Sequence, residues 1–293
     1  MTSLRILVTG AGGQLGGEVA AAGTLRGHDV VATTRSECDV LDPASVGRAI
    51  DAHRPAVVIN CAAWTDVEGA ENNSDGAFAL NAMAPRILAA ACDSRDILIV
   101  HMSTDYVFNG SGTAPLDEWA APAPLSVYGA SKLAGEQEVR GVARRHQVIR
   151  TSWLYGRDGP NFVLAILRRA DERKELRVVA DQTGTPTWTG HLAPALIRVA
   201  ERGIPGTYHL SNAGETTWHG FAGAIMQAAG RSGHVSPISA ADYASQVARP
   251  AYSVLDNRAW RILGEAPLPD WREGLSAYVD ELRSRGKLTP ALP

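Results

Sequence analysis

Short apolar runs alternate with amphipathic stretches through the first half of the 293-residue chain. Short apolar runs bounded by turn residues are typical of buried strands, and apolar residues at intervals of three and four are typical of helices. The pattern predicts strands at residues 4–8, 29–33, 56–60, 97–102 and 148–152. It predicts helices at residues 14–25, 43–53, 78–92 and 128–145, the second of them capped by Asp42.

Strands that alternate with helices predict βαβ units and a parallel sheet. The fold class expected is therefore α/β, a Rossmann-type doubly wound parallel sheet with a smaller C-terminal substrate-binding domain. We expect the nucleotide domain at residues 1–152, with later segments partly returning to it, and mainly the substrate domain at residues 153–293. In that second half, helices are predicted at residues 161–173, 191–202 and 218–229.

The overall composition is that of an ordinary globular protein, with 45% hydrophobic and 20% charged residues. A net charge of -3 argues against a general nucleic-acid binder. The chain has no apolar stretch near the roughly 20 residues of a membrane span, and the run at residues 4–8 is too short for a signal peptide. We therefore expect a cytoplasmic protein, in which Cys38, Cys61 and Cys92 form neither a disulfide framework nor a zinc site.

A glycine-rich segment, Gly-x-x-Gly-x-x-Gly, follows the first predicted strand and opens the first predicted helix. Glycines let the backbone approach a pyrophosphate closely, and a helix N-terminus offers free N–H groups to it. A structural turn is the alternative, but the position on the first strand of a βαβ series favours a dinucleotide site. The residues expected to bind the cofactor here are Gly10, Gly13, Gln14, Leu15 and Gly16.

The second predicted strand ends without the acidic residue that binds the ribose 2′-hydroxyl in NAD-selective proteins. Arg35 stands there instead and could meet a 2′-phosphate, which favours NADPH and leaves NADH possible. The alternative is a solvated surface arginine. Asp39 could contact the adenine side, and Val40 beside it is also expected to bind the cofactor.

Tyr128 and Lys132 are four residues apart and share one face of a predicted helix. A lysine ammonium favours the phenolate and lowers the tyrosine pKa, which makes proton transfer feasible. The same lysine can hold the nicotinamide ribose. Lysine accounts for three of the 28 basic residues, so a lysine four residues after Tyr128 is an informative choice and not a typical basic residue of this chain. Both residues are therefore expected to be catalytic and to bind the cofactor.

Thr104 and Asp105 follow the strand at residues 97–102, at the carboxyl end where ligands bind in open α/β sheets. We expect Thr104 to hydrogen-bond the substrate oxygen beside Tyr128. A turn or a helix cap is the structural alternative.

Other conspicuous residues have a structural interpretation. The eight histidines form no metal-binding pattern, and His101 is interpreted as a satisfied core histidine. Trp119 and Trp188 are interpreted as packing residues. The charged run at residues 168–177 is interpreted as a solvated helix end.

Six longer motifs resemble the extended short-chain dehydrogenase/reductase superfamily and, within it, the dTDP-4-dehydrorhamnose reductases, over nearly the whole length. They lie at residues 9–16, 60–65, 103–110, 150–156, 184–187 and 249–257. The resemblance implies reduction of the C4 keto group of dTDP-4-dehydro-β-L-rhamnose to dTDP-β-L-rhamnose, the last step in making that activated sugar. It implies that Ala62, Ala63 and Thr65 lie along the cofactor, and that Thr104, Asp105 and Trp153 line the sugar pocket.

Two departures from the family pattern occur at Thr34, where many relatives carry an acid, and at Trp64, where many carry tyrosine. The first strengthens the NADPH prediction, and the second has no interpretation from sequence. A nucleotide-sugar epimerase or dehydratase of the same superfamily stays open, as does a non-catalytic regulatory subunit of the methionine adenosyltransferase type. A homodimer, metal dependence and a related sugar nucleotide as substrate also stay open, although no metal ligand is predicted.

Overall fold

The computed structural model describes residues 3–172, 175–243, 245 and 247–288, and its centre is a parallel β-sheet. Six strands form this sheet within the described residues, and every neighbouring pair is parallel. Their spatial order is β10 (Gly206–His209), β5 (His146–Thr151), β4 (Leu98–Thr104), β3 (Val57–Asn60), β1 (Arg5–Thr9) and β2 (Asp29–Thr33). All five predicted strands are therefore confirmed, with ends shifted by two residues or fewer.

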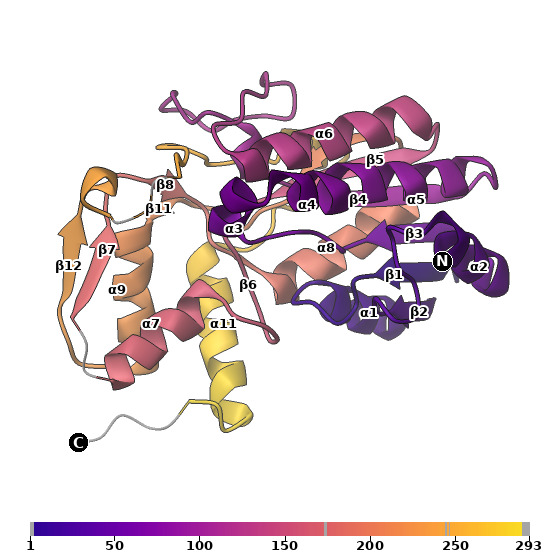
Figure 1. The fold of residues 1–293 in the computed structure, drawn as a ribbon. Coiled ribbons are helices and arrows are strands. Elements are labelled where there is room, and N and C mark those ends of the chain that lie inside the picture. Colours follow the sequence, from indigo (N-terminus) through magenta and orange to yellow (C-terminus); the bar gives the residue numbers. More distant parts are fainter. Residues whose placement is uncertain (1–2, 173–174, 244, 246, 289–293) are drawn as a thin grey trace.

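Helices cover both faces of the sheet (Figure 1). Side chains alternate along a strand, so Ile6 and Val8 face one apolar cluster while Leu7 faces another. The first cluster is closed by α1 (Gly16–Leu25) and α8 (Thr189–Arg202), which pack on each other. The second is closed by α2 (Pro43–His53), α5 (Ala84–Asp93) and α6 (Val127–Val142). Burial on both faces explains the nearly continuous apolar strand sequences.

The predicted helices differ from the observed ones mainly at their ends. Asp42 caps α2 as expected, its carboxylate accepting a hydrogen bond from the N–H of Ala44. The predicted helix at residues 128–145 ends at Val142, because Ala143 is already extended and leads into β5. The predicted helix at residues 161–173 is α7 (Phe162–Asp171), and Arg173 lies outside the described residues.

The predicted helix at residues 78–92 contains a π-helical turn that the sequence pattern hides. The turn, η1 (Ala79–Met83), directly precedes α5, and two short helices precede the turn, α3 (Val67–Asn72) and α4 (Ser74–Phe78). Asn81 in this turn bonds both main-chain groups of Trp64, donating to its C=O at 3.0 Å and accepting from its N–H at 2.8 Å. The turn therefore anchors the segment after β3.

A smaller group of elements packs around a third apolar cluster, beside the sheet in Figure 1. Phe221, Trp271 and Tyr278 are buried at its centre. The main elements are α7, β7 (Leu176–Val179), α9 (Trp218–Ala229), β12 (Val235–Ile238) and α11 (Trp271–Ser284). The shorter elements, which lie in this group, in the sheet layer or between the two, are β6 (Leu154–Tyr155), β8 (Thr183–Gly184), β9 (Thr187–Trp188), β11 (Thr216–Thr217), η2 (Asp105–Val107), η3 (Ala240–Asp242) and α10 (Arg258–Ile262).

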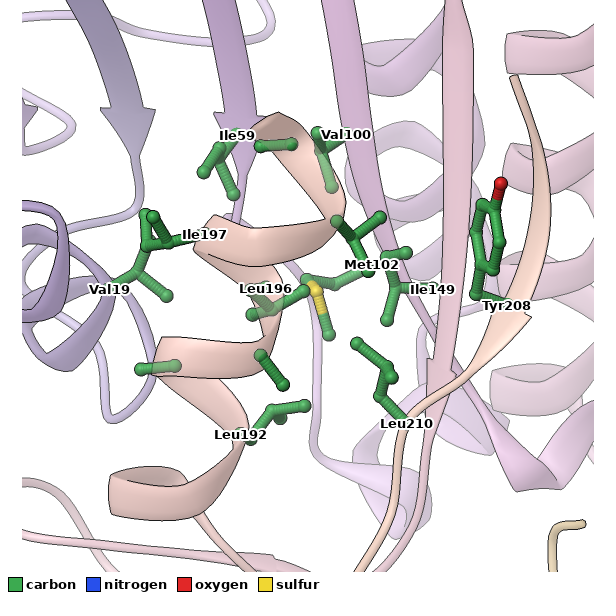
Figure 2. Packing of buried hydrophobic residues seen from close by; sticks show 14 of the residues in the cluster. Val19, Ile59, Val100, Met102, Ile149, Leu192, Leu196, Ile197, Tyr208 and Leu210 are labelled. Atoms are coloured by element: carbon green, nitrogen blue, oxygen red, sulfur yellow. The ribbon is translucent and has the colours of Figure 1, made fainter. Parts of the chain in front are cut away.

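From the second half of the chain, β10, α8 and α10 belong to the sheet layer. β10 is its edge strand, and the apolar side of α8 covers its centre (Figure 2). In that view Leu192, Leu196 and Ile197 of α8 lie among side chains from the central strands. The core under the sheet is therefore completed by residues distant in sequence.

The loop at residues 109–124 is fixed by the chain segment that returns near the C-terminus. Leu116 donates its N–H to the C=O of Val254 and accepts from the N–H of Asp256. Glu118 is buried and accepts from the N–H groups of His209 and Ala259. The two halves of the chain are thus joined beside β10. In the described part of the chain, no helix is long and apolar enough to cross a membrane.

We predict that Leu196→Ala destabilises the sheet core by about 2–5 kcal/mol, because Leu196 is fully buried and its removal leaves a cavity. Leu25→Ala is the matched control, since Leu25 on α1 is 90% exposed and should change stability by less than about 0.5 kcal/mol. Urea denaturation measures both. Equal stability of the two variants would contradict the assignment of α8 to this core.

Candidate active site

A cavity of ≈ 610 Å³ lies at the carboxyl ends of β1, β3, β4 and β5. Parallel strands bring these ends to one edge of the sheet, so residues distant in sequence meet there. The predicted site residues that line the cavity are Gly13, Gln14, Leu15, Ala63, Thr65, Thr104, Asp105, Tyr128, Lys132 and Trp153. Gly10, Gly16, Arg35, Asp39, Val40 and Ala62 do not line it.

The first and last glycines of the glycine-rich loop are required by close backbone packing. Gly10 has φ +70°, and a Cβ there would lie 2.6 Å from the nitrogen of Ala62. A Cβ at Gly16 would collide with the carbonyl oxygen of Gly10. The N–H of Gly13 donates to that same oxygen at 3.0 Å and closes the turn. Gly10, Gly16 and Ala62 therefore shape the loop, and Gly13 to Leu15 present it to the cavity.

This loop fits the diphosphate of a dinucleotide. The described residues provide no side-chain cap for α1, so the N–H groups of its first turn stay available at the positive end of the helix dipole. The side-chain amide nitrogen of Gln14 is buried and has no hydrogen-bond partner among the described residues. A buried donor without a partner is costly, and a phosphate oxygen would satisfy it.

The end of β2 offers one exposed cation. The side chain of Arg35 is 84% exposed and lies 3.8 Å from the Asp39 carboxylate. Val40, in contrast, is buried in the apolar cluster under α2. Glu37, an acid that the sequence reasoning missed, accepts hydrogen bonds from the N–H and hydroxyl of Thr34, which lower its pKa.

Tyr128 and Lys132 lie on the face of α6 that lines the cavity, but the lysine has a different partner from the one expected. Lys132 Nζ donates a hydrogen bond to the C=O of Met102 at 2.6 Å. Burial lowers the pKa of Lys132 to about 8 and raises the pKa of Tyr128 to about 12. A hydrogen bond with Thr104 opposes the rise at Tyr128. The net lowering of the tyrosine pKa expected from sequence is not found in this structure, because burial dominates.

Thr104 and Asp105 form one hydrogen-bonded unit at the end of β4. Asp105 is 1% exposed and accepts from the hydroxyls of Thr104 at 3.0 Å and Ser253 at 2.6 Å. Burial raises the pKa of Asp105 to about 6, although these hydrogen bonds oppose the rise. Ser253 belongs to the segment returning near the C-terminus, so both halves of the chain hold this carboxylate.

Trp153 forms one wall of the cavity in a strained backbone conformation, with φ +44°. Its ring stacks on Trp218 at 3.5 Å between centroids. Gly184 lies behind it, where a Cβ would collide with the indole ring. Trp218, at the start of α9, was missed as a site residue because nothing in its local sequence distinguishes it from a packing residue.

A second cavity, of ≈ 670 Å³, adjoins the first and shares Val67, Tyr106 and Trp218 with it. Arg169, Arg177 and Arg249 line it, together with apolar side chains of α7 and β7. Residues 168–171 are the exposed end of α7, as the sequence indicated, but Arg169 and Arg177 of that charged run also line this cavity.

Two further sequence interpretations change, those of His101 and Trp119. His101 is fully buried, and its Nδ1 contacts the Asn60 amide, but its Nε2 has no partner among the described residues, so it is not fully satisfied. Trp119 is 65% exposed, with Arg258 over its ring, and is not a core packing residue. No group of three or more His, Cys, Asp or Glu in the described ranges could hold a metal ion.

The parallel sheet, the glycine-rich loop and the Tyr-x-x-x-Lys helix, which meet at one edge, define a short-chain dehydrogenase/reductase-like dinucleotide fold. The family model described as RmlD substrate binding domain matches residues 4–284, and the chain belongs to this family.

Relatives in this family reduce keto groups on dTDP-linked sugars, according to their names. A dTDP-4-dehydrorhamnose reductase from Streptomyces griseus is 42% identical over 288 residues, 96% of this chain and 95% of the relative. A dTDP-4-keto-6-deoxy-D-glucose reductase from Streptomyces niveus is 41% identical, over 93% of this chain and 95% of the relative. The crystal structure of dTDP-4-dehydrorhamnose reductase from Bacillus anthracis in complex with NADP has a TM-score of 0.93 at 37% identity, covering 96% of this chain and all of that one.

We predict that Asp105 makes stability fall as the pH rises from about 4 to about 6. Its folded pKa of about 6 lies above the ordinary 3.8, so the folded state binds the proton more tightly and loses stability when the carboxyl ionises. Relative to Asp105→Asn, the wild type should lose up to about 3 kcal/mol across this window. Urea denaturation at a series of pH values measures the loss. Parallel pH profiles for the two proteins would show that Asp105 carries no such shift.

Proposed function

We propose that the protein reduces the C4 keto group of dTDP-4-dehydro-β-L-rhamnose to give dTDP-β-L-rhamnose, with NADPH as the reductant. The observation that carries the proposal is that Thr104, Tyr128 and Lys132 line one cavity together with the glycine-rich loop. The Streptomyces griseus and Bacillus anthracis relatives carry the name of this reaction. The Streptomyces niveus relative carries the name of a reductase for a different sugar, so the sugar is the part that most needs a test.

The cofactor-binding proposal assigns the dinucleotide diphosphate to the loop from Gly13 to Leu15 and the Gln14 amide. Ala63 and Thr65 would lie along the cofactor, and Lys132 would hold the nicotinamide ribose. Arg35, exposed at the end of β2, is the proposed partner of the 2′-phosphate. When bound, the reduced nicotinamide supplies the hydride.

In the proposed complex the substrate occupies both cavities. The sugar would occupy the first, against Thr104, Asp105 and Trp153. The second suits a nucleoside diphosphate, since it combines apolar walls with arginines, which pair bidentately with phosphate oxygens. The shared Trp218 would lie where the sugar joins its nucleotide.

The proton in this reaction comes from Tyr128 in our proposal. Its pKa of about 12 keeps the phenol protonated at neutral pH, as a proton donor requires. The Thr104 hydroxyl, already hydrogen-bonded to Tyr128, would orient the keto oxygen as negative charge develops on it. The Lys132 ammonium would stabilise the phenolate left behind.

The expected outcome with dTDP-4-dehydro-L-rhamnose is rapid loss of reduced-nicotinamide absorbance and formation of dTDP-L-rhamnose. We expect NADPH to be preferred to NADH, because Arg35 is an exposed cation at the ribose end. The measurement runs both cofactors side by side, with Arg35→Ala in parallel. An unchanged cofactor ratio in Arg35→Ala would remove Arg35 from the 2′-phosphate site.

Other outcomes of the same assay identify the rival functions. NAD⁺ that stays bound through purification, without net oxidation of added cofactor, would favour an epimerase or dehydratase. Cofactor binding without any turnover, together with recovery of a stoichiometric enzyme partner, would favour a regulatory subunit.

We predict that Tyr128→Phe lowers kcat by roughly 10²–10⁴-fold, because the variant lacks the proton donor. Tyr208→Phe is the matched control, since Tyr208 is buried on β10 and its hydroxyl bonds the C=O of Ile204, away from the cavity. Steady-state kinetics with NADPH measures both variants. Turnover near the wild-type rate in Tyr128→Phe would exclude Tyr128 as the acid.

A further inference from the structure

One face of α6 carries four polar side chains at intervals of four residues: Tyr128, Lys132, Glu136 and Arg140. The first two line the cavity, whereas Glu136 lies one turn deeper and is fully buried. A buried carboxylate is rare unless it is paired, because removal of its charge from water is costly. Glu136 touches neither cavity, so its burial requires another explanation.

Glu136 is held by two other elements, β4 and β5, as well as by its own helix. Arg150 on β5, itself 2% exposed, donates to both carboxylate oxygens at 2.8 Å in a bidentate pair. Arg140 donates at 2.7 Å from the next turn of α6. Ser103 on β4 donates at 2.6 Å. Arg150 in turn contacts His209 on β10.

The contact with Ser103 fixes the part of β4 that forms the site. Ser103 lies between Met102, whose C=O accepts from Lys132, and Thr104, which hydrogen-bonds Asp105. The Glu136 carboxylate therefore holds β4 at the residue between the two groups that position the proposed lysine and threonine.

The titratable groups that affect Lys132 come from three elements. Glu136 on the same helix and Cys61 after β3 raise the lysine pKa, but burial outweighs both. His101 on β4 faces the lysine and is neutral, since burial and the charges of Lys132 and Arg140 hold its pKa well below the ordinary value. Burial would raise the pKa of Glu136, but the hydrogen bond and charge of Arg150 hold it below the ordinary value. Glu136 is thus the ionised anion that faces Lys132.

We propose that Glu136 is a positioning residue of the reaction: its buried carboxylate fixes the end of β4 through Ser103 and supplies the negative charge that keeps the Lys132 ammonium in place. This inference rests on the role proposed above for Lys132 in holding the cofactor ribose. Arg150 balances the carboxylate so that it can stay ionised in the interior.

The test is the pH dependence of NADPH binding, followed by fluorescence titration without sugar substrate, and then of kcat/KM. In Glu136→Gln the charge that supports Lys132 is lost, so the lysine loses its proton at lower pH. The basic limb of the NADPH-binding profile, where affinity falls as the pH rises, should move down by about one pH unit. At pH near 8 this is about a tenfold loss of NADPH affinity. Glu138→Gln is the control, because Glu138 lies on the same helix but pairs with Arg86 at the surface.

Arg140→Gln provides a test that does not depend on how Glu136→Gln folds. The Arg140 side chain is 33% exposed, and Arg150 still pairs with both oxygens of Glu136 when Arg140 is lost, so no buried charge is left unpaired. It removes a cation that competes for Glu136, and the basic limb should move to higher pH. A basic limb at the wild-type pH in every variant that folds would overturn the proposal. A shift to lower pH in Glu136→Gln and to higher pH in Arg140→Gln would support it.

Lys132→Met separates this inference from the proposed function. If Lys132→Met binds NADPH as the wild type does at every pH, the role proposed for the lysine fails and the inference fails with it. If Lys132→Met abolishes the basic limb while Glu136→Gln and Arg140→Gln leave it unmoved, the positioning role of Glu136 is excluded and the role proposed for Lys132 is retained.

Discussion

The buried ion pair between Glu136 and Arg150 is the constraint on which the geometry of this edge of the sheet depends. Two charges taken out of water cost several kcal/mol each, and only close pairing with further hydrogen bonds offsets that cost. The bidentate contact, Ser103 and Arg140 supply those partners. Because the partners lie on α6, β4 and β5, this neutralisation fixes the three elements in one register. Tyr128, Lys132 and Thr104 then occupy fixed positions relative to one another.

The second half of the chain completes the same edge. Ser253 bonds the carboxylate of Asp105, so the segment returning near the C-terminus holds the residue next to Thr104. Arg249, four residues earlier, pairs with Glu68 on α3 and lines the second cavity. Each contact joins the segment at residues 249–257 to an element from the first half of the chain. The two cavities adjoin where these segments cross from one half of the chain to the other. Trp218 and Tyr106 line both cavities.

The sheet was predictable because strands buried on both faces leave nearly continuous apolar runs, and because the glycine-rich loop and the Tyr-x-x-x-Lys spacing are local patterns. What depends on tertiary packing was not predictable. The π-helical turn at Asn81 follows from its bonds to Trp64, seventeen residues away, and the apolar periodicity around it resembles an ordinary helix. Arg177 could not be recognised as a cavity residue from sequence, because the cavity is assembled from segments that are distant along the chain. The carbonyl partner of Lys132 lies thirty residues away, on β4, and no pattern in the sequence indicates it.

The pKa of Tyr128 makes sense in the direction of reduction. A tyrosine that acts as a base needs a low pKa, but one that donates a proton must keep it until the substrate oxygen becomes negative. Burial provides this, raising the pKa of Tyr128 to about 12, while burial lowers that of Lys132 to about 8. In the proposed reaction Tyr128 then starts as a neutral phenol, whereas Lys132 is still mostly an ammonium at neutral pH. When the proton leaves Tyr128, the phenolate and the ammonium attract each other in a site of low polarity, where that attraction is stronger than in water. The same burial that keeps the phenol protonated beforehand therefore strengthens the attraction between the phenolate and the Lys132 ammonium once the proton has been transferred.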